Sequence, residues 1–458
     1  MKKYLSLLFL LPNMLHAQQQ ADSLFIHRLS VEILNTTDAN SNLKYLTKQI
    51  GHRLSGSSQM YLAEQWGKKL LYDCGADEVF MQECVVPHWV RGAKEHGVVS
   101  YQQSGKVIEK SLSLLSLGNA VGTGTNGVQG GIVEVHSFQE LVAKQKAVKN
   151  KIVFFNVPFE DTLIETSTAY GRNVTYRGGA ASASAKYGAK AVIVRSMTHE
   201  GDNIPHTGAL RYNDSFPHIP AFALGVDDVR MLQDIVANDG DAKLSLFSYC
   251  NILPDTIAHN VVGVLKGTEY PESVITIGGH LDSWDVGEGA QDDGAGIIHT
   301  IEILRAFTKL GYRPKHTIHF VLFANEENGT RGGAAYAASF KSNQMQSYFA
   351  LESDAGGFTP RGFGITCPDA VYEKILGWKS FFEPYFGERI SAGGGGADIG
   401  FLNEQYHTPT AGLETDSQRY FDLHHTEKDI FENVNMRELK LGAINMAALI
   451  YLVDSKGL

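Results

Sequence analysis

Acidic and histidine residues gather at the ends of apolar runs in the second half of the chain. They are His280, Asp282, Asp292, Glu326, Glu327 and Asp354. Carboxylates held beside one another repel and raise each other's pKa. A multivalent cation removes that cost, and a mixture of histidine and carboxylate favours zinc over calcium or magnesium, which prefer oxygen ligands alone. These residues therefore predict a zinc site, provided that the fold brings them together.

The elements around these residues are expected to bring them together. Strands are predicted at residues 260–267, 273–280, 316–327 and 348–354. Helical runs occur at residues 294–310, 333–340, 372–382 and 436–453. Strands that are apolar along their length and alternate with helices predict an α/β fold, in which a mostly parallel mixed sheet is sandwiched by helices. Ligands bind such sheets outside the carboxyl ends of the strands, so the six side chains should share one crevice.

Five short motifs follow one another along the chain. They are HLDS (280–283), DDGAG (292–296), NEENG (325–329), ESDAGG (352–357) and HHTEKD (424–429). As an ordered set they resemble the co-catalytic zinc aminopeptidases and carboxypeptidases, most closely the plasma glutamate carboxypeptidase (carboxypeptidase Q) branch. The spacings of 12 residues from His280 to Asp292 and of 34 from Asp292 to Glu326 fit this resemblance. IGHRLSGS (50–57) and HWVRG (88–92) are similar to the N-terminal portion of that branch.

The resemblance implies two Zn²⁺ ions per chain. Their ligands would be His280, Asp292, Glu327, Asp354 and His425. Asp292 would bridge both ions. His280 and Asp354 would complete one site. Glu327 and His425 would complete the other.

The resemblance also implies catalytic roles for two further carboxylates. Glu326 would be the general base, and Asp282 would accept the free N–H of His280 and fix its tautomer. A water that bridges two zinc ions loses a proton near neutral pH and becomes a hydroxide nucleophile, while Glu326 passes the proton to the leaving amine. Neighbouring side chains on an extended chain point in different directions, so Glu327 can bind metal while Glu326 stays free. In such families the peptide bond after the bridging aspartate tends to be cis.

Two residues are candidates for contact with the substrate. His424 precedes the predicted ligand His425, and the family pattern favours His425 as the ligand because it stands directly before the TxxD-like stretch. His424 would then point towards the substrate and donate to the oxyanion. In residues 391–400 four consecutive glycines let the backbone approach a ligand closely, and Asp398 would hold a substrate ammonium. The alternative for this segment is a flexible loop in which Asp398 caps a helix.

The function that these features predict is hydrolysis of short peptides by a zinc-dependent exopeptidase, with dipeptides that have a free N-terminus as the expected substrates. A dipeptide presents both termini, so the choice between aminopeptidase and carboxypeptidase stays open. One alternative is a receptor-like binding protein that has lost its metals, but every ligand is present here. Another alternative is a glutaminyl cyclase-like acyltransferase with a single zinc. The HLDS and NEENG motifs and the inserted segment 118–248, described next, argue against it.

Composition divides the chain into two domains. Residues 118–131 are rich in glycine, threonine and asparagine, and 118–248 then alternate short strands and helices. This segment resembles a protease-associated domain inserted into a zinc peptidase domain of residues 18–117 and 249–458. In relatives such a domain is a lid or docking module without catalysis. We expect it to narrow access to the site and to favour short substrates.

The N-terminus has the layout of a signal peptide, with Lys2 and Lys3 before an apolar run and expected removal of residues 1–17. A secreted or periplasmic location is therefore expected. No later segment has about eighteen uninterrupted apolar residues, so no membrane span is expected after signal removal. The net charge of −10 and the lack of a long basic run argue against nucleic acid as a partner. Relatives are often dimers, so a homodimer is possible.

Export would permit disulfides among the four cysteines, which are Cys74, Cys84, Cys250 and Cys367. Four cysteines allow three complete pairings, and the sequence does not choose among them. The pair Cys74 and Cys84 would close the shortest loop. None of the four has the C-x-x-C spacing that a thiolate zinc site uses, so a zinc site of that kind is not predicted.

Overall fold

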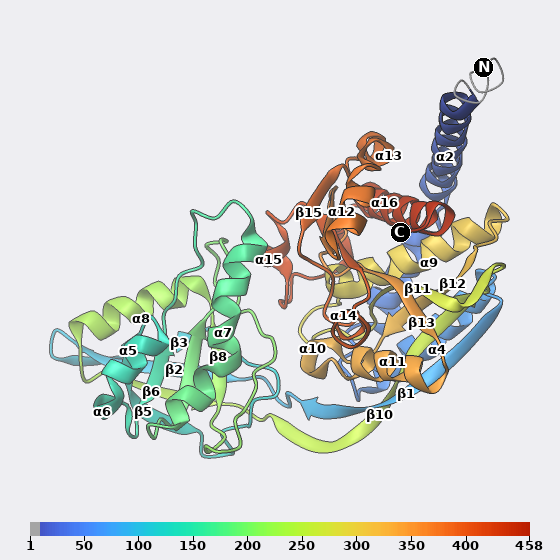
Figure 1. Cartoon of the computed structure of the whole chain (residues 1–458). Coiled ribbons are helices and arrows are strands. Elements are labelled where there is room, and N and C mark those ends of the chain that lie inside the picture. Colours follow the sequence, from blue (N-terminus) through green and yellow to red (C-terminus); the bar gives the residue numbers. More distant parts are fainter. Residues whose placement is uncertain (1–9) are drawn as a thin grey trace.

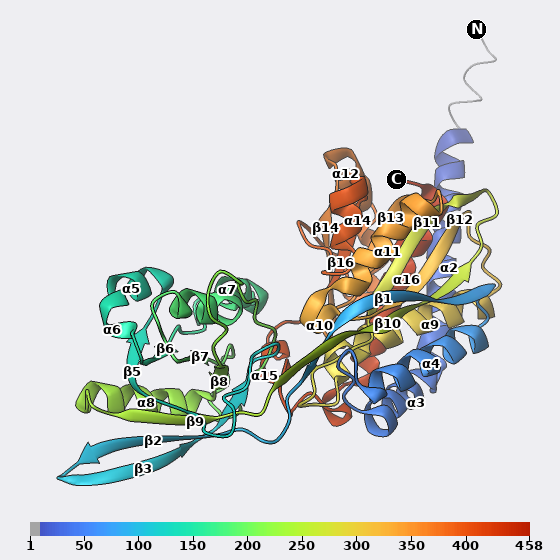
Figure 2. The ribbon, with the colours of Figure 1, turned by 90° about the horizontal axis from the view of Figure 1, so that it is seen from below.

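Two eight-stranded sheets form the centres of two lobes in this computed structural model, which describes residues 10–458 and the side chains from residue 18 onward. The larger lobe contains residues up to Val90 and from Asn251 to the C-terminus. The smaller lobe, here called the inserted lobe, contains residues 96–247. Figures 1 and 2 show the two lobes side by side, with β1 and β10 leading from one to the other.

The sheet of the larger lobe mixes parallel and antiparallel neighbours. Its order is β1 (Glu78–Val90), β10 (Asn251–Leu265), β12 (His316–Phe323), β11 (Tyr270–His280), β13 (Gln346–Glu352), β16 (Thr410–Thr415), β14 (Pro360–Thr366) and β15 (Arg389–Ala392). The central strands β12, β11, β13 and β16 run parallel. The predicted α/β fold with a mixed sheet is confirmed, and the four predicted strands correspond to β10, β11, β12 and β13.

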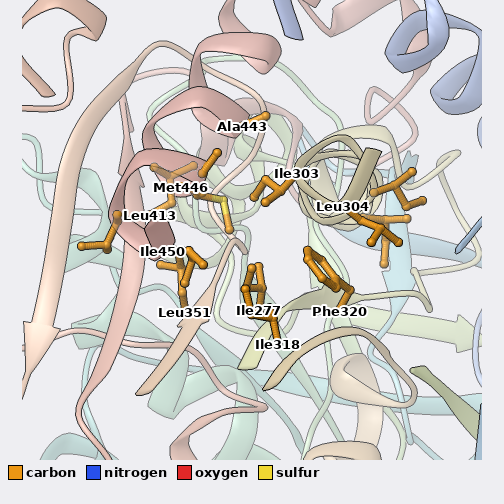
Figure 3. Packing of buried hydrophobic residues seen from close by; sticks show 14 of the residues in the cluster. Ile277, Ile303, Leu304, Ile318, Phe320, Leu351, Leu413, Ala443, Met446 and Ile450 are labelled. Carbon is orange, nitrogen blue, oxygen red and sulfur yellow. The ribbon is translucent and has the colours of Figure 1, made fainter. Parts of the chain in front are cut away.

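Helices cover both faces of this sheet because its strands are apolar on both. On one face lie α2 (Leu10–Asn35), α9 (Ala295–Lys309) and α16 (Met436–Lys456). Figure 3 shows the residues of α9 and α16 that pack over the strands, among them Ile303, Leu304, Ala443, Met446 and Ile450. On the other face α11 (Arg331–Ser342) and α14 (Gly400–Tyr406) pack against Val321 and Phe323 of β12. Alternate residues of one strand therefore enter different cores.

Further α-helices complete the larger lobe. They are α3 (Asp38–Tyr45), α4 (Ser58–Asp73), α10 (Glu326–Gly329), α12 (Asp369–Leu376), α13 (Lys379–Phe382) and α15 (Tyr420–Leu423). The side chain of Ser57 caps α4 by accepting the N–H of Met60. In Figure 1, α15 lies on the side of the larger lobe that faces the inserted lobe.

The inserted lobe is built on the second sheet. Its strand order is β3 (Lys106–Leu112), β2 (His96–Gln103), β9 (Lys243–Phe247), β5 (Val128–Val135), β6 (Ile152–Phe155), β7 (Ala191–Arg195), β8 (Ala221–Leu224) and β4 (Leu114–Ser116). Its helices are α5 (Phe138–Ala143), α6 (Gln145–Val148), α7 (Thr166–Ala185) and α8 (Val226–Asn238). Separate apolar clusters cover the two faces of the sheet, so this lobe has its own core.

The inserted lobe begins earlier in the chain than residue 118. Strands β2, β3 and β4 lie between residues 96 and 116, and β2 pairs with β9 while β4 pairs with β8. The alternating pattern of residues 94–117 indicates strands, but it carries no information about the sheet that they join. The segment therefore belongs structurally with residues 118–247 and not with the larger lobe.

The predicted signal peptide, residues 1–17, lies outside the described side chains, and its first nine residues lie outside the described backbone. Within the described part, no helix has the length and apolar character that a membrane span requires. The four cysteines have free thiols, so the described residues contain no disulfide between Cys74 and Cys84. Burial raises the pKa of both of these thiols to about 12.

Candidate metal centre

The carboxyl ends of three neighbouring strands of the larger lobe meet at one place. Strand β11 ends at His280, β12 is followed by Glu326 and Glu327, and β13 is followed by Asp354. Asp292 comes from the segment that leads into α9. The acids and the histidine predicted from the sequence therefore lie together outside the carboxyl ends of the strands, where open α/β sheets bind their ligands.

His280, Asp292 and Asp354 form the first group of possible metal ligands. The Nε2 atom of His280 lies 3.1 Å from Oδ1 of Asp292 and 3.4 Å from Oδ1 of Asp354. His280 is fully buried. These three atoms are close enough to share one cation.

The second group lies on the opposite oxygen of Asp292. Its Oδ2 atom is 3.1 Å from Nε2 of His425 and 3.5 Å from Nε2 of His424. The same Nε2 of His425 is 3.2 Å from Oε2 of Glu327. Asp292 therefore touches both groups, one oxygen to each, as a bridging ligand requires. The rings of His424 and His425 stack with centroids 3.5 Å apart, so both histidines, and not His425 alone, come within reach of this position.

The electrostatics of the crevice fit bound divalent cations. Burial raises the pKa of Glu326 to about 8, and it holds the pKa of Glu327 well above its ordinary value, with neighbouring carboxylates adding to both. Burial raises the pKa of Asp292, but its hydrogen bond with His280 and the nearby charges of His425 and His424 outweigh that effect and hold the pKa well below its ordinary value. The Oδ2 atom of Asp292 is buried without a hydrogen-bond partner. Crowded carboxyls and an unpartnered oxygen beside histidine nitrogens are what a metal ion would satisfy.

Asp282 has a different partner from the predicted one. The Nδ1 atom of His280 lies 2.9 Å from the backbone oxygen of Asp282, and 3.8 Å from its carboxylate. The carboxylate instead accepts the backbone N–H groups of Glu326 at 3.0 Å and of Glu327 at 3.3 Å. The backbone of Asp282 thus faces the histidine, while its side chain fixes the segment that carries the two glutamates.

Glu326 and Glu327 lie on the helical turn α10 and not on an extended chain. Successive residues on a helix point about 100° apart, so the two carboxyls still diverge. Glu327 reaches His425 and also accepts the N–H of Trp284 at 3.2 Å. Glu326 lines the open cavity described below.

Two aspartates that the sequence analysis did not rank hold the segment around Asp292. Asp429 accepts the N–H groups of Ala290 at 3.1 Å, Gln291 at 2.6 Å and Asp292 at 3.1 Å. Asp293 accepts the N–H of His280 at 3.0 Å. The peptide bond between Asp292 and Asp293 is cis, as the resemblance implied. Asp429 ends the HHTEKD motif, and that position was the available signal.

Arg53, in the IGHRLSGS motif, fixes the loop between His280 and Asp292. It is fully buried, and its guanidinium donates to the backbone oxygens of Glu288 and Gly289, each at 2.9 Å, and to that of Leu281. Burial lowers its pKa, while Asp429 and other acids nearby oppose this effect. Five donors in a fixed fork suit three carbonyls in one loop, which explains an arginine at this position.

A cavity of about 1170 Å³ opens above the two groups, with walls from both lobes. Asp292, Glu326, Glu327, Asp354, His424 and His425 line it from the larger lobe. Tyr170, Arg177, Arg211 and Tyr212 line it from the inserted lobe. A substrate that reaches the candidate metal ligands would therefore contact both lobes.

Asp398 does not line this cavity, which contradicts its predicted contact with a substrate ammonium. It is fully buried, and neither of its carboxylate oxygens has a hydrogen-bond partner, so it does not cap a helix either. Burial beside Glu352 holds its pKa well above the ordinary value. The glycine run 393–396 does allow close approach, but to Glu352: a Cβ on Gly396 would lie 2.0 Å from Cδ of that residue.

Comparison with known proteins identifies the family. The model of peptidase family M28 matches residues 260–450, which contain all of the candidate ligands. Carboxypeptidase Q from Homo sapiens is 33% identical over 414 residues, which are 90% of this chain and 84% of the relative. The chain belongs to peptidase family M28. Together with the cluster of acids and histidines, this membership makes it a metallo-exopeptidase.

Solved structures of other proteins agree with the fold. A peptidase M28 precursor from Shewanella amazonensis superimposes with a TM-score of 0.87 at 28% identity, over 95% of this chain and 97% of that one. A zinc aminopeptidase from Bacillus subtilis gives a TM-score of 0.65 at 18% identity, over 92% and 95% of the two chains. At 18% identity, the similarity to the Bacillus subtilis enzyme shows only that the two chains share a fold.

Proposed function

We propose that this M28 peptidase is a two-zinc exopeptidase that hydrolyses unblocked dipeptides and other short peptides. The observation that carries the proposal is the position of Asp292, whose two oxygens reach two separate groups of ligands at the base of a cavity. A mixture of histidine and carboxylate ligands favours zinc. His280 and Asp354 would hold one ion, and Glu327 with His425 the other.

Two bound zinc ions would supply Lewis acidity, which would lower the pKa of the attacking water and polarise the scissile carbonyl. Glu326 has the position and the protonation behaviour of a general base, because it lines the cavity and burial raises its pKa to about 8. Its carboxylate would accept a proton from the attacking water and return it to the nitrogen of the leaving amine. Asp282 acts through the backbone N–H of Glu326, which it holds at 3.0 Å.

Arg177 supports recognition of a free C-terminus. It lies on α7, is largely buried, and its guanidinium lies over the ring of Tyr170 at 5.4 Å. Its Nε atom has no hydrogen-bond partner. A guanidinium on the wall of a cavity suits a carboxylate, because its planar fork of donors matches two oxygens. The carboxylates that line the cavity within the described residues are the four assigned above, so none is left for an ammonium, and we favour the C-terminus over the free N-terminus that the sequence suggested.

Hydrolysis of unblocked dipeptides by the purified enzyme should stop on chelation and return on addition of zinc. The reason is that removal of the metal removes the Lewis acid that lowers the pKa of the attacking water. The measurement compares free, N-blocked and C-terminally amidated dipeptides, with zinc content determined in parallel. We expect cleavage of the free and N-blocked peptides and slow cleavage of the amides. Protein that holds two zinc ions per chain and cleaves none of them would contradict the proposal and favour a binding protein or a cyclase.

Replacing Arg177 with methionine should raise KM for free dipeptides by about 10- to 100-fold, because a hydrogen bond to a charged group contributes about 1.5–3 kcal/mol. KM for the amidated dipeptides should change little, since they lack the carboxylate. Arg172→Met is the matched control, because Arg172 lies on the same helix and pairs with Glu160 at the surface. Equal increases for free and amidated peptides would assign Arg177 a structural role only.

The remaining sequence predictions are retained as proposals. The resemblance supports a protease-associated domain as the identity of the inserted lobe, with the boundary moved to about residue 96. Export to the periplasm or the exterior rests on the N-terminal residues, and the homodimer rests on the resemblance. The short length of the preferred substrates follows from a cavity whose walls come from both lobes.

A further inference from the structure

His425, a candidate metal ligand of the larger lobe, is held by a residue of the inserted lobe. The N–H of Thr207 donates to the backbone oxygen of His425 at 3.1 Å. The Nδ1 atom of His425 in turn lies 3.2 Å from the backbone oxygen of Thr207. The backbone of His425 is left-handed, with a φ of 62°, so its conformation depends on such external contacts.

The geometry decides the tautomer of His425 when it binds metal. Its Nε2 atom faces Asp292 and Glu327, so Nε2 would be the ligand atom and the proton would be on Nδ1. That proton can only go to an acceptor, and the oxygen of Thr207 is one. Arg177, 3.3 Å from the same Nδ1, can only donate, so this tautomer leaves its guanidinium available to a substrate.

Polar contacts on both sides of His425 keep Thr207 in place. In the larger lobe, Nζ of Lys428 lies 2.9 Å from Oε2 of Glu200 and 2.6 Å from Oδ2 of Asp202. Thr198 donates to Asp422 at 3.1 Å. Thr207 itself is fully buried, and its hydroxyl donates to the oxygen of Ser116 at 2.9 Å. The segment 198–207 of the inserted lobe is therefore fastened to the segment 422–428 that carries the histidine.

His280, the histidine of the other group, has no such dependence. Its Nδ1 atom faces the backbone oxygen of Asp282, which belongs to the larger lobe. The two groups thus differ in which lobe supplies the partner of the histidine. A partner of this kind orients the ring and is worth about 10- to 100-fold in metal affinity.

We infer that the inserted lobe completes one of the two metal positions, because the carbonyl of Thr207 orients His425. Docking of the lobe and binding of the zinc ion at His425 are therefore coupled, whereas binding of the ion at His280 does not depend on docking. This inference rests on the proposed two-zinc function. Because coupling between two binding events is reciprocal, filling the position at His425 should also tighten the docking of the inserted lobe. The lobe is then part of the metal site and more than a cover over it.

The test is the double variant Glu200→Ala/Asp202→Ala in the full chain, which loosens the docking without changing a metal ligand. Competition with a chromophoric chelator gives the two zinc dissociation constants. We expect one of them to rise about tenfold and the other to stay at its wild-type value. Asp227→Ala is the control, because Asp227 pairs with Arg230 at the exposed surface of α8 in the same lobe.

A second measurement needs no substitution. Amide hydrogen exchange of the segment 198–207 in the wild-type protein should slow as one of the two zinc equivalents binds, and not as the other binds. The inference would be overturned if both zinc dissociation constants of the double variant stayed unchanged or rose equally. It would also be overturned if the rate of amide hydrogen exchange in the segment 198–207 did not change on zinc binding. A wild-type protein that binds fewer than two zinc ions would instead contradict the proposed function, so the two failures are distinguishable.

Discussion

Replacing Glu326 with glutamine is expected to lower kcat for dipeptide hydrolysis by about 10²- to 10⁴-fold, the usual contribution of a general acid–base group. Glutamine has nearly the same shape, but it cannot accept a proton from water at any pH that the protein survives. The carboxyl of Glu326 lines the cavity, whereas the adjacent Glu327 reaches His425. The substitution should therefore remove proton transfer and leave both zinc ions bound.

Steady-state kinetics together with zinc analysis distinguish these effects. Glu327→Gln is the matched neighbour, and we expect that variant to lose zinc from one position in proportion to its loss of activity. KM of Glu326→Gln should stay close to the wild-type value, since the substrate contacts are unchanged. If Glu326→Gln kept more than about a tenth of wild-type kcat, or lost zinc as Glu327→Gln does, the general-base role would have to be abandoned.

The sequence was informative about the larger lobe because its site follows from local rules. The strand that ends at His280 and the strands that precede Glu326 and Asp354 are apolar runs of ordinary length, and parallel neighbours bring their carboxyl ends to one edge. Asp292 lies in the segment that follows the first of those strands, whereas only the ordered motifs pointed to His425. The structure brings all five side chains together.

Contacts between segments distant in sequence were not predictable in this way. The carboxylate of Asp282 faces the backbone of Glu326 because of how α10 turns after β12, and no spacing in the sequence encodes that turn. Asp398 follows a glycine run typical of ligand loops, yet the loop folds back onto Glu352 and leaves the carboxyl buried. In both cases the residue type was informative and the direction of the side chain was not.

The inserted lobe shows the same limit on a larger scale. Thr207 and Arg177 have no motif around them, and their contacts with His425 exist only because two lobes with separate cores dock together. The docking rests on pairs such as Lys428 with Asp202, which are 226 residues apart. A single sequence predicts which segments are strands, but it does not predict which surfaces of two lobes meet.

Replacing Asp292 with asparagine should have the largest effect of any single substitution in the site. Each of its two oxygens faces one group, with Oδ1 3.1 Å from His280 and Oδ2 3.1 Å from His425. An amide offers only one oxygen and no negative charge, so one ion loses this ligand and the other keeps only a neutral, weaker one. We expect zinc content to fall from two ions per chain towards zero and kcat/KM to fall by more than about 10⁴-fold, because the lowered pKa of the bridging water is lost.

Thermal unfolding with and without zinc gives a readout that does not depend on activity. A ligand that binds only the folded state raises its stability, so zinc should raise the Tm of the wild type and of the control Asp255→Asn, whose side chain is exposed. Asp292→Asn should show no such rise. If the variant still bound two zinc ions, Asp292 would not be a shared ligand, and two independent sites around His280 and His425 would have to replace the bridged pair.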